Sequence, residues 1–370
     1  MNARTEIANL ELTLNALELA GPVHLTIFDA ALLAQSHHPH FPPDVPVLIT
    51  SMKSSAVAAE VKLKLMLVYP GDHQVRLVYA SDSANVSIQE IGMSDIDGSD
   101  QFSEQTSLYV PPLAENTSFE GFQELVAHLR APEGCPWDRE QTHQTLRPNL
   151  LEETYETLSA IDTDDAAAMK EEFGDLLLQV VLHAQIASEY GEFKMADVIK
   201  GIHTKLVDRH PHVFGDMKIA DAEGVKRNWE RLKAHERQAK GERDVGLLDG
   251  IPVDLPALAQ ADAYQKRAAR VGFDWPEIEG VVDKISEEVE ELRQARDRDS
   301  QVEEIGDLFF ALANLARWKK IDPESALRAT NQKFRQRFAY IEANAREQGR
   351  ELESMTLEEM DVLWEQAKNL

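Results

Sequence analysis

The sequence predicts a mainly α-helical protein in which two similar helical domains follow a small α/β segment. Three observations support this fold class. Up to about residue 113, short apolar and β-branched runs alternate with turn residues, as in a segment that contains strands. From residue 118 onward, apolar residues recur at helical spacing. An acidic pattern then occurs twice, which indicates a duplicated helical module and not a short-period solenoid. We therefore expect domains at 1–113, 114–245 and 246–370.

The first segment is expected to mix strands with one or two helices. The turn residues at 70–73 predict a hairpin, because a proline and a glycine there separate two apolar runs. A helix is expected at 56–61 or at 5–19. The expected strands are 23–28, 45–50, 63–69, 75–79, 86–91 and 108–110.

The rest of the chain is expected to form long helices. Apolar residues recur at helical spacing between Phe119 and Leu129. The stretch 175–187 is mostly apolar, which predicts a helix buried on most sides. The polar stretch 234–246 is typical of a linker, and Pro252 and Pro256 prevent a helix from continuing beyond it.

Net charge and cysteine content limit which partners and which compartment the sequence is compatible with. A net charge of -27 over 370 residues argues against a general nucleic-acid or anionic-membrane surface. A phosphorylated small molecule can still bind where a metal or local cations offset the charge. The single cysteine, Cys135, has no recognisable base near it and favours a structural role in a reducing cytoplasm. No signal peptide or membrane-spanning stretch is evident, so we expect a cytoplasmic protein.

The repeated acidic pattern is E-x-x-E followed by E-x-x-D. Acids three residues apart share one helix face, so two such helices could gather four carboxylates. These carboxylates would repel one another unless a cation neutralised them, and hard oxygen ligands favour Mg²⁺ or Mn²⁺. The expected metal ligands are Glu153, Glu156, Glu172 and Asp175 in the first repeat and Glu288, Glu291, Glu304 and Asp307 in the second.

An isolated acidic helix is usually a solvated surface. Here a second acidic helix, the apolar run that follows it and the repetition of the whole arrangement favour a metal site. Gly174 and Gly306 directly precede the last aspartates and cost helix stability relative to alanine. They fit either the close approach of a ligand or the close packing of helices.

Basic residues also recur downstream of the acids. Lys205 and Arg209 are four residues apart on one helical face, as are Lys333 and Arg337. A single pair of this kind is more often a surface ion-pair partner. Its recurrence favours binding of a polyphosphate, whose remaining charge lysine and arginine can neutralise beside a metal.

Aromatic residues near the end of each repeat have two open interpretations. Trp229 with Lys233, and Trp364 with Lys368, share a face at a four-residue step. Such a pair could stack a nucleobase and hold a phosphate, or it could be a core tryptophan with a lysine that extends to solvent. The His-Pro-His segment at 210–212 is a weak metal signal, so capping or loop packing is favoured.

These residues resemble the MazG family of nucleoside triphosphate pyrophosphohydrolases, part of the all-α NTP pyrophosphatase group. The resemblance covers about 118–370. It implies a tandem-domain, magnesium-dependent enzyme that releases pyrophosphate from nucleoside triphosphates, usually as a homodimer; Mn²⁺ is a possible substitute. The matching stretches, besides the two acidic sets, are Gly134-Cys135-Pro136-Trp137-Asp138, Leu151 to Glu156, Gly174 to Leu177, Arg209 to Phe214, Val271-Gly272-Phe273-Asp274-Trp275 and Asn331 to Phe338.

The resemblance implies roles for individual residues. The acids would hold Mg²⁺, and Glu152 or Glu287 would orient the water that attacks between the α and β phosphates. The Lys205/Arg209 and Lys333/Arg337 pairs would stabilise the leaving pyrophosphate. We expect a broad base range and a house-cleaning role. The expected nucleotide contacts are Trp137, Trp229, Lys233, Trp275, Asn331, Trp364 and Lys368.

The N-terminal segment resembles the C-terminal half of a tetrapyrrole methylase domain. The resemblance rests on 62–72, on the strand at 75–79 and on 109–112. The glycine-rich half that would hold S-adenosylmethionine is absent, so we expect no methyltransferase activity. A docking or dimerisation role is favoured instead.

Three alternatives remain open at this stage. A ferritin-like di-iron oxidoreductase also gathers carboxylates in a helical bundle, but it needs E-x-x-H on two helices. A non-catalytic regulator could bind nucleotides or a protein partner. A phosphoribosyl-ATP pyrophosphohydrolase shares the chemistry but needs a ribosyl-phosphate pocket that the sequence does not reveal. The sequence also does not show which repeat turns over.

Overall fold

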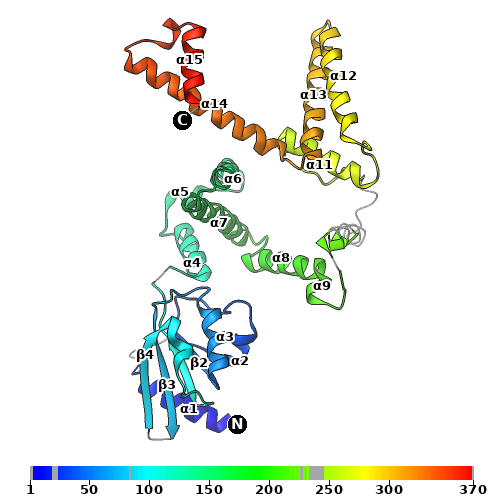
Figure 1. The fold of residues 1–370 in the computed structure, drawn as a ribbon. Helices are drawn as coiled ribbons and strands as arrows, with labels where there is room; N and C mark the ends of the chain where they lie inside the picture. The colour runs from blue at the N-terminus through cyan, green and yellow to red at the C-terminus, as the bar shows by residue number, and fades with distance from the viewer. Residues whose placement is uncertain are drawn as a thin grey trace. The chain divides into compact units, whose positions relative to one another are not determined.

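The computed structural model describes residues 3–18, 24–82, 85–114, 116–219, 221–222, 224–225, 228–229, 231–232 and 246–368 (Figure 1). Two compact units are present, one of Met1–Glu153 with Gly174–Val198 and the other of Thr154–Phe173 with Ile199–Leu370. This division does not follow the expected boundaries at 113 and 245, which stay a prediction. Residues 233–245, which cover the expected linker except for residue 246, lie outside the described residues.

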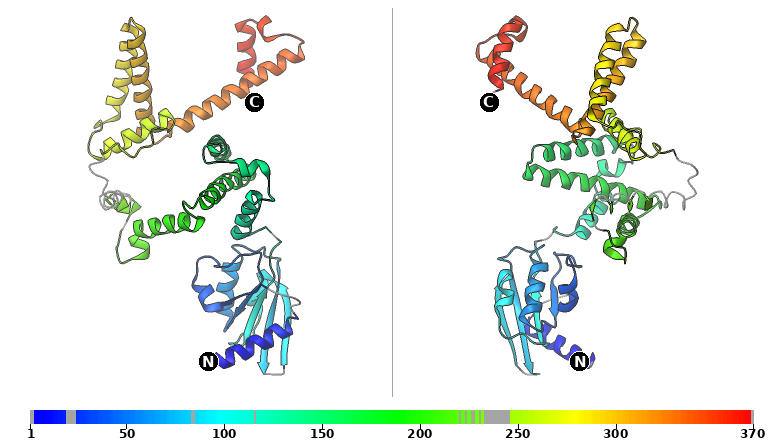
Figure 2. Two further views of the ribbon diagram at one scale, coloured as in Figure 1. Left: turned by 180° about the vertical axis from the view of Figure 1, so that it is seen from behind. Right: turned by 45° about the vertical axis from the view of Figure 1, so that its right-hand side comes forward.

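The N-terminal segment is a small α/β fold, as predicted. Its sheet has the strand order β1-β2-β5-β3-β4, with β1 parallel to β2 and the other neighbours antiparallel. Figure 2 shows this sheet with the helices of the same segment beside it. The 3-10 helix η1 (Met93–Gly98) follows β4. The elements are α1 (Ala3–Ala16), β1 (Thr26–Asp29), α2 (Ala30–Gln35), β2 (Val47–Thr50), α3 (Ser55–Leu65), β3 (Gln74–Asp82), β4 (Asn85–Gly92) and β5 (Thr106–Val110).

One expected strand of this segment is wrong. The stretch 63–69 begins inside α3, which starts where the Ser54 hydroxyl accepts the N–H of Val57. Val61 and Leu65 lie one helical turn apart and pack into the core under the sheet, whereas Leu63 is exposed. The observed hairpin is therefore β3–β4, and both alternative helices of the prediction, α1 and α3, are present.

The remainder of the described chain is helical, which confirms the mainly α fold class. No helix in the described part of the chain is long and apolar enough to cross a membrane. The first repeat contains α4 (Phe119–Arg130), α5 (Pro136–Glu140), α6 (Arg147–Asp162), α7 (Ala166–Glu189), α8 (Met195–Arg209) and α9 (Pro211–Phe214). The second contains α11 (Ala257–Arg270), α12 (Ile278–Gln294), α13 (Arg298–Trp318), α14 (Pro323–Glu347), η2 (Leu352–Ser354) and α15 (Leu357–Ala367).

In the second repeat, α12 and α13 form a helical hairpin that carries the acids (Figure 1). The Asp297 side chain caps α13 by accepting the N–H of Ser300, which starts the helix directly after the turn. Helix α11 packs against α13. Helices α14 and α15 pack against each other around Ile341 and Leu363. The acidic hairpin is thus held from one side by α11.

Candidate metal and nucleotide site

The second acidic set forms a carboxylate cluster between α12 and α13. One oxygen each of Glu288, Glu304 and Asp307 lies within 4.8 Å of the others. Glu288 is 3% exposed, and its buried Oε2 has no hydrogen-bond partner within the described part of the chain. Glu291 is outside this group of three. Loss of hydration, followed by the negative charges of Glu291, Glu288 and Asp307, raises the pKa of Glu304, so the other three acids of the set all act on Glu304.

The first acidic set gives a similar cluster. One oxygen each of Glu153, Glu156 and Glu172 lies within 4.8 Å of the others, and Asp175 is not part of that group. Both clusters consist of carboxylates alone, the donors that a hard divalent cation prefers. In the second cluster, the buried Glu288 Oε2 adds an oxygen without a partner among the described residues. An added Cβ at Gly174 or Gly306 would meet no atom within 4 Å, so no described atom packs closely there.

Lys284 is a site residue that the sequence analysis missed. Its Nζ lies 2.8 Å from Glu287 Oε1 and 2.8 Å from Glu288 Oε1. Hydrogen bonds to these two carboxylates raise the pKa of the lysine above its usual range. The available signal was its position four residues before Glu288, a spacing at which opposite charges meet on a helix. The same position of the first repeat holds Asn149, so the two repeats differ here.

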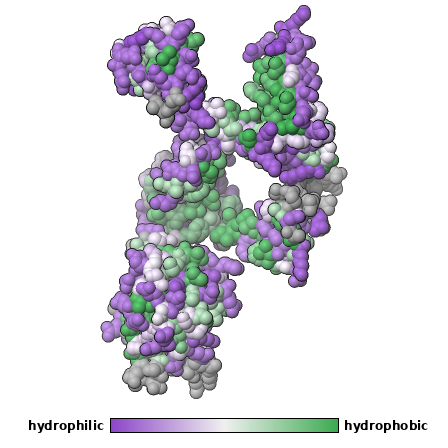
Figure 3. Space-filling view, viewed as in Figure 1, coloured by the Kyte–Doolittle hydropathy of each residue, from purple (hydrophilic) through white to green (hydrophobic). Residues whose placement is uncertain are grey.

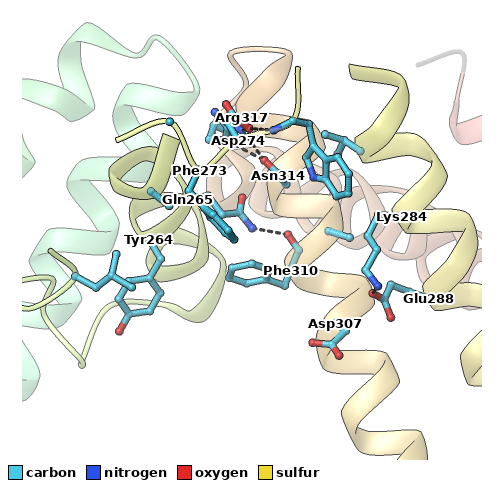
Figure 4. Close-up of a pocket in the computed structure, with 16 residues that line it drawn as sticks. Tyr264, Gln265, Phe273, Asp274, Lys284, Glu288, Asp307, Phe310, Asn314 and Arg317 are labelled. Carbon is cyan, nitrogen blue, oxygen red and sulfur yellow. Dashed lines mark hydrogen bonds and ion pairs between the residues drawn. The ribbon is translucent and has the colours of Figure 1, made fainter. Parts of the chain in front are cut away.

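A cavity of about 680 Å³ opens beside the second cluster (Figure 4). Glu288 and Asp307 line it together with aromatic residues from α11, α13 and the loop between α11 and α12. Trp275 is the one predicted nucleotide contact that lines this cavity, although the close-up does not label it. The aromatic residues of the lining are Tyr264, Phe273, Trp275 and Phe310.

A polar network fixes the loop that carries Trp275. The Asp274 carboxylate accepts hydrogen bonds from Arg317, from the Trp318 indole and from the backbone N–H of Trp275. Burial opposes ionisation of Asp274, but these donors and the Arg317 charge together hold its pKa below its usual value. The Trp275 ring also packs on Gly280, where an added Cβ would lie 2.8 Å from the ring.

Other predicted contacts of the second repeat do not line this cavity. On α14 and α15, the Arg337 guanidinium lies 5.4 Å from the Trp364 ring centroid, and Phe334 lies 5.2 Å from the same ring. Lys368 pairs with Glu365 and therefore does not act with Trp364 as a free cation. Asn331 and Lys333 are exposed residues of α14.

The structure also describes most of the predicted phosphate and nucleotide contacts of the first repeat. The Trp229 ring meets the His210 ring edge-on at 5.2 Å, and His210 directly precedes the short helix α9, which contains Pro211 and His212. Lys205 is exposed and Arg209 is half-buried. Trp137 is 57% exposed on α5.

Three predicted site residues remain: Lys233, Glu152 and Glu287. Lys233 lies outside the described residues. Of the two expected water-orienting acids, Glu152 is exposed, and Glu287 is exposed while its carboxylate binds Lys284.

The fold and the site define a class of helical proteins with two repeats, each of which carries a carboxylate cluster. A family model for the MazG nucleotide pyrophosphohydrolase domain matches residues 141–214. A model for phosphoribosyl-ATP pyrophosphohydrolase matches residues 258–334. The two matches therefore fall on the two repeats.

Relatives cover both repeats. The chain is 47% identical over 250 residues to the nucleoside triphosphate pyrophosphohydrolase/pyrophosphatase MazG of Thermotoga maritima. The aligned region covers 67% of this chain and 95% of that protein. It is 45% identical over 250 residues to the nucleoside triphosphate pyrophosphohydrolase of Escherichia coli, over 66% of this chain and 94% of that protein. It is 42% identical over 372 residues to the uncharacterized protein YabN of Bacillus subtilis, over 97% of this chain and 74% of that protein.

The chain belongs to the MazG nucleotide pyrophosphohydrolase family and is a hydrolase that acts on phosphoric anhydrides. This confirms the resemblance found in the sequence and overrides the di-iron alternative. The likeness of residues 1–113 to a methylase domain stays a prediction, because neither of the two family models covers them.

Proposed function

We propose that the chain hydrolyses nucleoside triphosphates between the α and β phosphates and releases nucleoside monophosphate and pyrophosphate. One observation carries this proposal: Glu288 and Asp307 of the carboxylate cluster line the same cavity as Trp275 and Phe310. A triphosphate bound at the acids through a cation would place its base against aromatic rings. The relatives from Thermotoga maritima and Escherichia coli are named as nucleoside triphosphate pyrophosphohydrolases, which supports this reaction.

The second cluster would hold Mg²⁺, with Mn²⁺ as a substitute, through Glu288, Glu304 and Asp307, supported by Glu291. When bound, the cation supplies charge neutralisation for the phosphate oxygens and the leaving pyrophosphate. The chain supplies the remaining functions. Glu287 orients the attacking water and accepts its proton at the carboxylate, and Lys284, which lies 2.8 Å from this carboxylate, donates to a phosphate oxygen.

We assign corresponding roles to the first repeat. Its ligands are Glu153, Glu156, Glu172 and Asp175, with Glu152 beside them. Lys205 and Arg209 in the first repeat, and Lys333 and Arg337 in the second, are the proposed phosphate ligands. Because Lys333 and Arg337 do not line the cavity, their contact with phosphate requires a movement of α14 or the α14 of a second copy.

A homodimer is part of the proposal. The α12–α13 hairpin exposes Val282, Phe309 and Leu312 by 47%, 56% and 43%, and Figure 3 shows apolar residues gathered along this hairpin. Two helices that leave such residues in water lose the burial that stabilises amphipathic helices. The same hairpin of a second copy would cover this face and complete a four-helix bundle.

The test is a panel of nucleoside triphosphates with Mg²⁺, in which nucleoside monophosphate plus pyrophosphate is resolved from nucleoside diphosphate plus phosphate. We expect pyrophosphate from several bases and no turnover in chelator. Release of inorganic phosphate in the first step would refute the proposed bond. No turnover with any nucleotide, in Mg²⁺ and in Mn²⁺, would favour the non-catalytic regulator.

A second candidate substrate follows from the family match of residues 258–334. Because this stretch matches phosphoribosyl-ATP pyrophosphohydrolase, phosphoribosyl-ATP belongs in the same panel. Its hydrolysis at a rate well above that of every nucleoside triphosphate would replace the broad-range proposal.

A further inference from the structure

Gln265 is a buried amide in the wall of the cavity. It lies on α11, is 7% exposed, and lines the cavity beside Phe273 and Phe310 (Figure 4). Its Nε2 donates to the backbone carbonyl of Phe310 at 2.8 Å. Because a carbonyl oxygen can only accept, this bond fixes which end of the amide is nitrogen and which is oxygen.

The fixed amide leaves one acceptor unused. Gln265 Oε1 is buried and has no hydrogen-bond partner among the residues that the structure describes. A buried acceptor without a donor is unfavourable, and an apolar side chain of similar size would avoid the penalty. The arrangement is therefore one in which a bound ligand supplies the missing N–H or O–H.

The residues that line the cavity near Gln265 indicate which part of a nucleotide would reach it. Tyr264, Phe273 and Phe310 present aromatic surface in the same lining, which suits a flat heterocycle and not a phosphate. The Arg317 guanidinium, the arginine of this lining, is already bound to Asp274 and Asn314. The metal-binding acids and Lys284 belong to another part of the lining, where the phosphates would lie.

We infer that Gln265 is a specificity-determining residue, whose Oε1 accepts a hydrogen bond from an N–H of the nucleobase. This inference rests on the proposed function and names the part of the substrate that the cavity recognises. Every standard base carries at least one such N–H, on an exocyclic amine or a ring imide. The contact therefore permits a broad base range but excludes a base without a donor.

Purine riboside triphosphate supplies the decisive comparison, since its base has the shape of adenine but no N–H donor. We would measure the Kd of the α,β-methylene forms of ATP and purine riboside triphosphate with Mg²⁺ by calorimetry. The protein is the full chain with Glu153→Gln and Glu156→Gln, so that binding reports on the second repeat. The variants are Gln265→Leu and, as a matched control, Gln260→Leu, which removes another α11 glutamine outside the cavity lining.

We expect the parent and Gln260→Leu to prefer the adenine compound by about 10-fold or more, and Gln265→Leu to bring the two Kd values within about 3-fold. A preference that survives in Gln265→Leu, or no preference in the parent, overturns the inference. Gln265→Met provides a second variant if the leucine variant does not fold. Pyrophosphate release by the unsubstituted protein is assayed separately. If that protein is active and Gln265→Leu keeps the preference for the adenine compound, only the role of Gln265 is refuted. If the unsubstituted protein is inactive, the proposed function is refuted.

Discussion

Replacing Lys284 by methionine is expected to destabilise the metal-free second repeat and to strengthen its binding of Mg²⁺. Lys284 Nζ lies 2.8 Å from Glu288, whose side chain is 4% exposed. Removing one partner of a buried ion pair costs about 3–5 kcal/mol. Because the Lys284 side chain is 37% exposed and water screens it, we expect a loss of about 1–3 kcal/mol.

The same ion pair competes with a cation for Glu288. If the competition is worth about 1.4 kcal/mol, its removal raises the Mg²⁺ affinity about tenfold. The assays are urea unfolding in chelator and Mg²⁺ calorimetry without nucleotide, in the background with Glu153→Gln and Glu156→Gln.

Lys266→Met is the matched control for this prediction. Lys266 Nζ lies 2.6 Å from the carboxylate of buried Asp262 at the same four-residue spacing, but this pair is outside the carboxylate cluster. We expect the control to lose stability and to keep the parent's Mg²⁺ affinity. An unchanged or weaker Mg²⁺ affinity in Lys284→Met would refute the competition for Glu288.

Two further predictions concern the Trp275 loop and the α15 terminus. Gly280→Ala is expected to displace the Trp275 ring, since the new Cβ would lie 2.8 Å from it, and to weaken nucleotide binding about 10-fold by calorimetry. Gly201→Ala, where a Cβ meets nothing within 4 Å, should bind as the parent does. The Glu359 carboxylate accepts hydrogen bonds from the Arg350 guanidinium and from the Thr356 N–H. These bonds, together with the Arg350 charge, lower the pKa of Glu359 to about 2. The ionised Glu359 carboxylate therefore contributes fully to the free energy of unfolding above its unfolded pKa of about 4.5, and this contribution is lost as the pH falls toward 2. Glu359→Gln should flatten this part of the pH dependence of unfolding; an unchanged slope would refute the assignment.

The acidic clusters could be predicted because helical spacing is a local property. Residues three apart in E-x-x-E and E-x-x-D must share a face, and the structure brings Glu288, Glu304 and Asp307 together. The Lys284 contact was equally local but was overlooked. Short apolar runs are ambiguous between strand and helix, which explains the wrong strand at 63–69.

Contacts that depend on tertiary packing could not be predicted from residue spacing. Gln265 bonds a backbone carbonyl 45 residues away, and no short pattern marks it. Trp364 and Lys368 do have the predicted spacing, but Glu365 competes locally for the lysine. A shared helix face therefore indicates which residues can meet and does not decide which pair forms.

In the proposed function, the carboxylate cluster of the second repeat is a metal-dependent pyrophosphohydrolase site. It is tested by Mg²⁺-dependent pyrophosphate release from ATP, with Glu288→Gln placed in a full-length parent that carries Glu153→Gln and Glu156→Gln, so that the assay reports on the second repeat. Glu290→Gln is the control, because Glu290 lies on the same helix but bonds Gln294 outside the cluster. We predict a loss of at least about 100-fold in kcat/KM for Glu288→Gln and parent activity for Glu290→Gln. Activity in Glu288→Gln equal to that of this parent would show that the second cluster is not the site of hydrolysis.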